Sequence, residues 1–346
     1  MSNPLRIGVA AGVGLVLAAL PLYLESFWLQ TSLFAMAAIV SAIGLTLLVG
    51  LAGQLSLGHA FFVAIGAYGY AYLAGHGVPP ALAMVGAVAL AGIAGALFSP
   101  IAGRVRGIYL GLASLGLVFL GQHILQNATS VTGGYEGVAV EPFSLLGFSF
   151  SDSDPDEFVV LGVRYGQLER LWYVGLVVVG LAIWYARNLV RSRPGRALAT
   201  VRDGEVAAAV LGVDVVRYKA AAFTVSSMYA GLGGVLTALA FGRIVPESFG
   251  FLLSVDFLVM IVIGGAGSVG GAAAGAVFVT ALPLVLNHYS GSLPLLAEPG
   301  SGGIGASEFS RFVYGVAIVA VLLFARDGLA GLVRRSRSHE VKERLT

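Results

Sequence analysis

Long apolar runs recur along the whole of this 346-residue chain. A helix needs about 20 apolar residues in succession to cross the roughly 30 Å of hydrocarbon in a bilayer. The runs approach that length, and Asp, Glu, Lys and Arg make up only 11% of the residues, whereas soluble domains carry about 25%. The sequence therefore predicts an all-α fold, a polytopic bundle of membrane-spanning helices.

The apolar runs indicate about ten crossings, at residues 7–24, 27–49, 57–75, 79–99, 107–126, 171–189, 218–241, 252–264, 271–289 and 311–325. The first run exceeds the roughly 7–15 residue apolar region of a cleavable signal peptide, so we interpret it as a retained helix. One transmembrane domain is expected over residues 1–330, followed by a basic cytoplasmic tail at 331–346.

Basic residues concentrate at positions that precede the first run or follow an even number of runs. They lie before the first run, between the fourth and fifth, after the sixth and after the tenth. The long interruption at residues 127–170 is instead acidic. Because cytoplasmic loops accumulate Lys and Arg, this pattern predicts that both termini and the 190–217 loop are cytoplasmic, with 127–170 on the other side.

The chain contains only two lysines, Lys219 and Lys342. Neither belongs to a Gly-x-x-x-x-Gly-Lys-Ser/Thr loop, the motif that cradles nucleotide phosphates, so any ATP would have to be hydrolysed by another subunit. The sequence also has no cysteine, no metal-binding motif and no plausible acid–base pair inside the runs. We expect a protein that is not an enzyme and that uses no metal or cofactor.

Three glycines, Gly265, Gly267 and Gly270, match the spacing of a dinucleotide-binding fingerprint. That motif needs a βαβ unit and an acidic residue about 20 positions further on. Here an apolar run follows, and position 287 is Asn. We therefore interpret Gly264, Gly265 and Gly267 as a tight turn between two helices.

Few ionisable residues occur inside the apolar runs. Such residues usually mark ion or substrate pathways, so their scarcity argues against coupling to a proton gradient. Asp256 lies near the outer end of the eighth run. We interpret it as a helix-end residue that reaches the interface, and a transport role is the alternative.

The basic loop at residues 190–217 contains a short helix-forming stretch at 205–211. Asp203 precedes this stretch as a candidate N-cap, and Gly212 follows it as a stop signal. We expect this helix to dock into a groove of a partner; the alternative is an amphipathic loop on the lipid headgroups. The expected docking residues are Arg196, Arg202, Asp203, Glu205, Ala207, Ala208, Leu211 and Gly212.

Three blocks together resemble the permeases of branched-chain amino-acid ABC importers, and specifically the M-type (LivM-like) of their two permease subunits. The first block, at residues 50–68, contains Gly53-Gln54-Leu55-Ser56-Leu57-Gly58-His59. The second begins with Thr132-Gly133-Gly134, and the third runs from Pro194 to Ser268. The resemblance covers most of the chain.

The resemblance implies a bacterial inner-membrane subunit that imports leucine, isoleucine and valine by alternating access. Its implied partners are an H-type permease subunit, two ATP-binding subunits and a periplasmic substrate-binding protein, with no nucleic acid. Related permeases carry urea, short amides or other amino acids, and these stay open as cargo. A stand-alone secondary carrier also stays open, as does a membrane enzyme or scaffold.

The glycine-rich block at residues 53–66 places small residues between bulky ones. Membrane backbone departs from a helix only where protein or water can satisfy its polar groups, and we expect this block to be an irregular or broken helix that lines the pathway. The expected pathway residues are Gly53, Gln54, Ser56, Gly58, His59, Thr132, Gly133 and Gly134.

Overall fold

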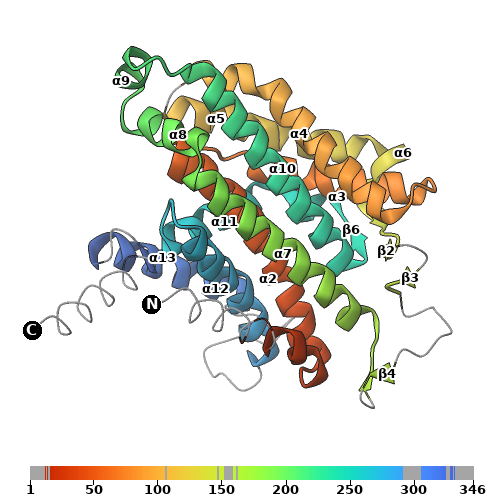
Figure 1. Cartoon of the computed structure of the whole chain (residues 1–346). Coiled ribbons are helices and arrows are strands. Elements are labelled where there is room, and N and C mark those ends of the chain that lie inside the picture. Colours follow the sequence, from red (N-terminus) through yellow and green to blue (C-terminus); the bar gives the residue numbers. More distant parts are fainter. Residues whose placement is uncertain are drawn as a thin grey trace, which may run out of the picture.

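The computed structural model describes residues 12, 14, 16–105, 107–145, 148–151, 159–160, 163–290, 305–324, 328, 329 and 331. Long helices make up most of the described chain (Figure 1). They are α2 Ser26–Thr46, α3 His59–Gly75, α4 Pro80–Arg104, α5 Ile108–Asn127, α7 Gln167–Arg191, α10 Val215–Phe241, α11 Phe251–Gly264, α12 Val269–His288 and α13 Ala306–Phe324. Each coincides with one of the predicted spans from the second to the tenth.

Shorter elements connect these helices. The helical ones are η1 Leu20–Leu22, η2 Leu47–Leu51, α6 Thr129–Thr132, η3 Gly134–Glu136, α8 Arg193–Asp203, α9 Glu205–Val210 and η4 Pro246–Phe249. The strands are β1 Val138–Ala139, β2 Ser144–Leu145, β3 Phe148–Ser149, β4 Val159–Val160, β5 Val163–Arg164 and β6 Arg243–Ile244. β1 pairs antiparallel with β6, β2 with β3, and β4 with β5.

Within the described residues, six helical segments are long and apolar enough to cross a membrane: Ser26–Leu51, Pro80–Arg104, Ile108–Asn127, Gln167–Arg191, Val215–Phe241 and Val269–His288. The chain is therefore a multi-pass membrane protein with an all-α bundle. The count of ten crossings and the cytoplasmic position of the termini stay predictions. Residues 7–11, 13 and 15 of the first predicted span, and residues 332–346 of the tail, lie outside the described residues.

Helices α2 and α10 form the buried centre of the bundle, and α3 packs against α10 and α4. Small residues permit these close crossings, as is usual between membrane helices. A methyl group on Gly66 of α3 would overlap the backbone of Gly231 of α10, and one on Gly234 would overlap the Val63 carbonyl. Most residues of α4, α5, α7 and α12 stay outside the core, which leaves apolar faces for lipid or a partner subunit.

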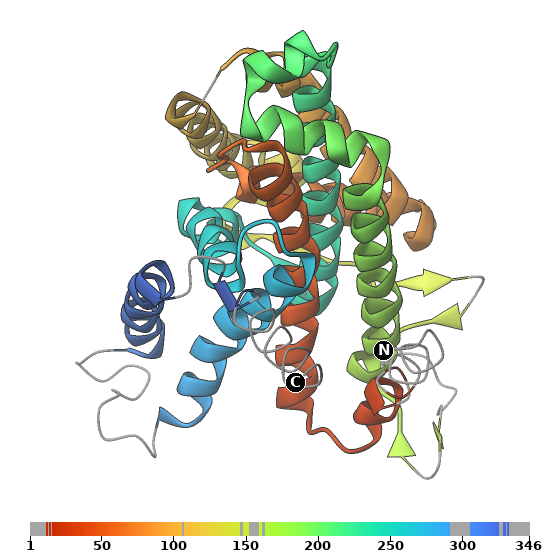
Figure 2. The same ribbon diagram turned by 60° about the vertical axis from the view of Figure 1, so that its left-hand side comes forward.

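The two long polar interruptions lie at opposite ends of the bundle. Figures 1 and 2 show α8 and α9 at one end and strand β4 at the other. Helix α13 stands at the edge of the bundle and contacts α11 and α12. The bundle therefore has a basic α8–α9 end and a strand-bearing end, the arrangement expected if these loops face opposite sides of a membrane.

Candidate functional site

Helix α2 does not end regularly. It continues as a π turn, η2, and residues 53–58 adopt no regular structure before α3 begins at His59. Gly53 has a φ of 66°, in the left-handed region that glycine adopts without steric cost. The irregular backbone expected within the 53–66 block is thus present over residues 53–58, and the rest of the block belongs to α3.

Serine hydroxyls from other helices accept hydrogen bonds from the backbone of this irregular segment and of the first turn of α3 that follows it. The Leu57 amide donates to Ser114 Oγ of α5 at 2.9 Å, and the Ala60 amide donates to Ser254 Oγ of α11 at 3.0 Å. Non-helical backbone at membrane depth requires partners of this kind. Both α5 and α11 therefore hold the segment in place.

Packing against α5 restricts position 58 to glycine. A Cβ on Gly58 would lie 2.6 Å from the Ser114 carbonyl oxygen, although the φ of −95° is open to any residue. The Gly58 amide donates to Ser56 Oγ at 3.3 Å, within the segment itself. A larger side chain at position 58 would push the segment away from α5.

Gln54 of the segment and His59, the first residue of α3, are buried and contact backbone carbonyls. Gln54 Nε2 donates to the Ala102 carbonyl at 2.8 Å, and among the described residues Gln54 Oε1 has no partner. His59 Nε2 lies 2.8 Å from the Ser41 carbonyl oxygen, and its ring packs edge-on against Phe257. The start of α3 is thereby connected to α2, α4 and α11.

Helix α8 reaches this region through one arginine. Arg202 Nη1 donates to the Gly50 carbonyl of η2 at 2.7 Å, and Arg202 also pairs with the Asp203 carboxylate at 2.9 Å. A Cβ on Gly53 would lie 2.9 Å from Arg202 Cγ. The loop between α7 and α10 therefore contacts both the π turn and the start of the irregular segment.

The turn between α11 and α12 meets the same π turn. Gly264 ends α11, and Gly265 and Gly267 have φ values of 103° and 95° before Ser268 caps α12 by accepting from the Gly271 amide. A methyl group on Gly50 would overlap the backbone of Gly267. Four elements, η2, α8 and the ends of α11 and α12, thus converge at Gly50.

An ion pair fixes α9 to the main bundle. Lys219 Nζ of α10 lies 2.9 Å from Glu205 Oε1, and the side chains are 3% and 24% exposed. Lys219 Nζ is also 3.5 Å from the Val105 carbonyl oxygen, just after α4. A displacement of α9 would therefore pull directly on α10.

The outer surface of α9 is apolar and exposed. Val206, Val210 and Leu211 project from the bundle, and Val210 is 83% exposed. Among the expected docking residues, Arg196, Ala207 and Gly212 are also exposed, whereas Ala208 is buried against the bundle. We call Val206, Val210 and Leu211 the α9 knob.

The predicted cap of α9 is wrong. Asp203 is the last residue of α8, and its carboxylate binds Arg202. Gly204, which offers no side chain, occupies the N-cap of α9. No helix was expected over residues 193–203, where α8 begins with the Ser192 side chain accepting from the Gly195 amide.

Thr132, Gly133 and Gly134 lie apart from the irregular segment. Thr132 Oγ1 donates to the Leu125 carbonyl at 2.6 Å near the end of α5, whereas Leu57 contacts Ser114 of the same helix. The two contacted residues of α5, Leu125 and Ser114, are about 16 Å apart along the helix axis, at about 1.5 Å per residue. The predicted pathway residues therefore form two separate groups.

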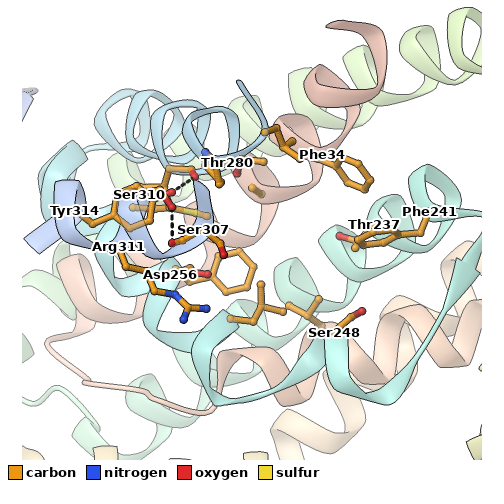
Figure 3. Close-up of a pocket in the computed structure, with 18 residues that line it drawn as sticks. Phe34, Thr237, Phe241, Ser248, Asp256, Thr280, Ser307, Ser310, Arg311 and Tyr314 are labelled. Carbon is orange, nitrogen blue, oxygen red and sulfur yellow. Dashed lines mark hydrogen bonds between the residues drawn. The ribbon is translucent and has the colours of Figure 1, made fainter. Parts of the chain in front are cut away.

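A cavity of about 400 Å³ lies among α2, α3, α10, α11, α12 and α13. Figure 3 shows Asp256 and Arg311 on one side of it and Phe34, Thr237 and Phe241 on the other. Its remaining lining consists of Ala38, Val63, Ser248, Leu253, Phe257, Met260, Val279, Thr280, Pro283, Leu284, Ser307, Ser310 and Tyr314.

Comparison with known proteins identifies the family. The family model described as the branched-chain amino acid transport system / permease component matches residues 23–322. The chain belongs to this family. No solved structure matches this permease significantly.

Curated relatives cover most of this permease. It is 34% identical over 308 residues to the high-affinity branched-chain amino acid transport system permease protein LivM of Salmonella typhimurium. The matched region covers 86% of this chain and 68% of the relative. Escherichia coli LivM is 33% identical over the same shares. The E. coli permease protein LivH is 26% identical over 84% of this chain and 90% of its own. The permease is thus LivM-like.

Sequence reasoning missed several features of this permease. Val206 and Val210 share one helical face at a spacing of four residues, a signal that could have identified the α9 knob. Arg311 could have been noted as a charge at the start of a predicted span. No local pattern indicated that it would share a cavity with Asp256.

Proposed function

We propose that this permease is the M-type subunit of an ATP-driven importer of leucine, isoleucine and valine in a bacterial inner membrane. The names of the LivM and LivH relatives support this cargo, and the higher identity to LivM supports the M-type place. An H-type subunit would form the other half of the pore. Two ATP-binding subunits supply the energy, and a periplasmic binding protein delivers the substrate.

The α9 knob docks into the ATP-binding subunit in this proposal. Exposed apolar side chains at the basic end of the bundle suit a groove on a partner protein, because burying them there removes apolar surface from water. The basic residues of the same loop support a cytoplasmic position for this end. Substrate delivery then takes place at the strand-bearing end.

The movement of the ATP-binding subunit reaches the pathway through two contacts. The Glu205–Lys219 ion pair transmits it to α10, and the Arg202–Gly50 hydrogen bond transmits it to η2 and residues 53–58. An irregular segment responds more readily than a helix, since fewer backbone hydrogen bonds must change. Alternating access then arises from displacement of this segment against α5 and α11.

The observation that carries the proposal is the Arg202–Gly50 hydrogen bond of 2.7 Å, which joins the docking loop to the π turn η2 just before the irregular segment. It gives the docking loop a direct mechanical connection to the predicted pathway. A loop that only lay on lipid headgroups would have no need of a contact with the interior of the bundle.

Affinity purification of the permease from its native membrane, followed by reconstitution, tests the proposal. We expect an ATP-binding subunit and an H-type permease to co-purify, and leucine uptake to require ATP together with the binding protein. Competition with urea, acetamide and polar amino acids identifies other cargo. Uptake by the permease alone in response to a pH or sodium gradient would instead favour a secondary carrier.

A further inference from the structure

Asp256 of α11 and Arg311 of α13 are opposite charges that line one cavity. They are close enough to interact electrostatically, and Figure 3 shows the Arg311 guanidinium beside Asp256. Yet within the described part of the chain neither side chain forms an ion pair or hydrogen bond, in contrast to Arg202 with Asp203 and Lys219 with Glu205. The two charged groups are adjacent but do not form a salt bridge.

Three of the hydroxyl groups around this pair are engaged elsewhere. Tyr314 donates to the Val279 carbonyl at 2.6 Å, and Ser310 donates to the Ser307 carbonyl at 2.8 Å. Thr237, on the opposite wall, donates to the Gly233 carbonyl at 2.9 Å. These protons are therefore not available to the Asp256 carboxylate.

Asp256 is partly buried, whereas Arg311 is exposed at the edge of the cavity. A carboxylate without a partner in an apolar bundle is costly and usually serves a function. Asp256 and Arg311 could be satisfied together by a ligand that carries an ammonium and a carboxylate group a short distance apart. The rest of the lining is largely apolar, with Phe34, Phe241 and Leu253 among its members. Such a lining suits a hydrocarbon side chain.

We propose that this cavity binds the α-amino acid during transport, which rests on the proposed function. Asp256 accepts hydrogen bonds from the substrate ammonium, Arg311 donates to its carboxylate, and the aliphatic side chain packs toward Phe34 and Phe241. The volume of about 400 Å³ falls within the roughly 300–1,000 Å³ of small-molecule sites. Arg suits this role because its planar guanidinium can donate two parallel hydrogen bonds to a carboxylate.

The position of the cavity agrees with a substrate site. Phe241 is the last residue of α10, and Phe34 lies in the half of α2 remote from η2, so the cavity is nearer the strand-bearing end. Phe257 lines it and packs edge-on against His59 at the start of α3. Occupancy of the cavity is thereby transmitted to the irregular segment.

The competing interpretation is a structural charge pair that holds α13 to α11. A structural pair and a substrate site respond differently to ligands that carry only one of the two charges. Leucine, 3-methylbutylamine, which lacks the carboxylate, and 4-methylpentanoate, which lacks the ammonium, form the matched set of probes.

The experiment measures binding of these three probes to the full chain in lipid nanodiscs. Asp256→Asn should weaken leucine and 3-methylbutylamine roughly 10- to 100-fold, and Arg311→Gln should weaken leucine and 4-methylpentanoate similarly. Each variant should leave the probe that lacks the corresponding charge unchanged. Glu308→Gln, on the same helix as Arg311 but outside the cavity lining, is the control and should match the wild type.

Three results would overturn the inference: no leucine binding by the wild type at millimolar concentration, unchanged leucine affinity in both variants, or equal loss of all three probes in variants that keep the wild-type elution volume. The expected selective loss, in which each variant weakens only the probes that carry the charge it would pair with, is called the crossed pattern. If one variant fails to fold, the other still shows whether its half of this pattern is present. Leucine uptake by the complete wild-type importer is measured in parallel. Uptake without the crossed pattern rejects the cavity alone, whereas absence of ATP-dependent leucine uptake rejects the proposed function.

Discussion

Arg202 Nη1 of α8 donates a 2.7 Å hydrogen bond to the carbonyl oxygen of Gly50, 152 residues earlier in the chain. The acceptor lies in the π turn that ends α2, where a side chain at position 50 would overlap Gly267. This contact joins the exposed loop between α7 and α10 to the turn that leads into the irregular segment at residues 53–58. The proposed coupling mechanism depends on it.

Glu205→Ala should impair both stability and coupling. The substitution leaves the Lys219 ammonium, which is 3% exposed, without its carboxylate partner, and we expect a loss of about 2–3 kcal/mol because a buried charge is left uncompensated. Thermal unfolding in detergent measures this loss. Transport and retention of the ATP-binding subunit should fall as well.

The double variant Glu205→Gln/Lys219→Met is the control for Glu205→Ala. Replacing both members of a buried pair by neutral groups is often nearly neutral, so its unfolding temperature should recover toward the wild type. Unchanged stability, transport and retention in Glu205→Ala would favour a surface loop without a docking role.

Polar substitutions in the α9 knob should release the ATP-binding subunit without unfolding the permease. Val210→Ser and Leu211→Ser remove apolar area that is exposed in the isolated chain, so their effect on unfolding should stay within about 0.5 kcal/mol. Co-purification of the ATP-binding subunit should decrease strongly. Ala209→Ser, at an exposed position of the same helix that carries little apolar area, should retain it; equal retention by all three variants would place the dock elsewhere.

Gly58→Leu should abolish transport while the complex with the ATP-binding subunit still assembles. The new side chain would displace residues 53–58 from α5, because even a Cβ would lie 2.6 Å from the Ser114 carbonyl oxygen. Gly58→Ala should give a smaller defect of the same kind. Gly116→Leu is the matched control on α5, where nothing lies within 4 Å of an added Cβ. Normal transport by Gly58→Leu would contradict the assignment of residues 53–58 to the pathway.

Labels at position 152 and at the C-terminus should react from opposite sides of the membrane. Position 152 lies outside the described residues, within the interruption between α5 and α7, and the expectation follows from the alternation of basic and acidic loops. Cysteines introduced at the two positions, in a chain that has none of its own, can be labelled with an impermeant maleimide. Reaction from the same side would mean that the number of crossings after position 152 is miscounted by an odd number.

Local sequence patterns predicted the helices well but not their contacts. Nine predicted spans coincide with α2–α5, α7 and α10–α13, because each carries an apolar run long enough to be read without its neighbours. The glycine-rich block revealed the irregular segment. Helix α8 was not predicted because its apolar residues form no long run. A proline and a glycine also follow its Ser192 cap within three residues, a pattern that resembles a turn.

Long-range partners could not be read from the sequence. Gly50 and Arg202 are far apart in the chain, and no local sequence feature of either residue indicates that the other is its partner. The cavity collects residues from six helices between α2 and α13 and from η4, and it exists only once α13 has packed beside α11. Asp256 was interpreted as a helix-end residue because its neighbours in sequence are apolar and give no sign of Arg311.

The number of leucine molecules imported per ATP hydrolysed, measured in proteoliposomes with the complete importer, tests the central claim most directly. A hydrogen bond to a charged group contributes about 1.5–3 kcal/mol, and we take the lower limit because the Arg202 side chain is 45% exposed. The Arg202→Gln importer should therefore keep hydrolysing ATP but lower this ratio by about tenfold. Arg193→Gln, at an exposed position of the same helix that is not among the expected docking residues, should keep the wild-type ratio. An unchanged ratio in Arg202→Gln would contradict coupling through Gly50.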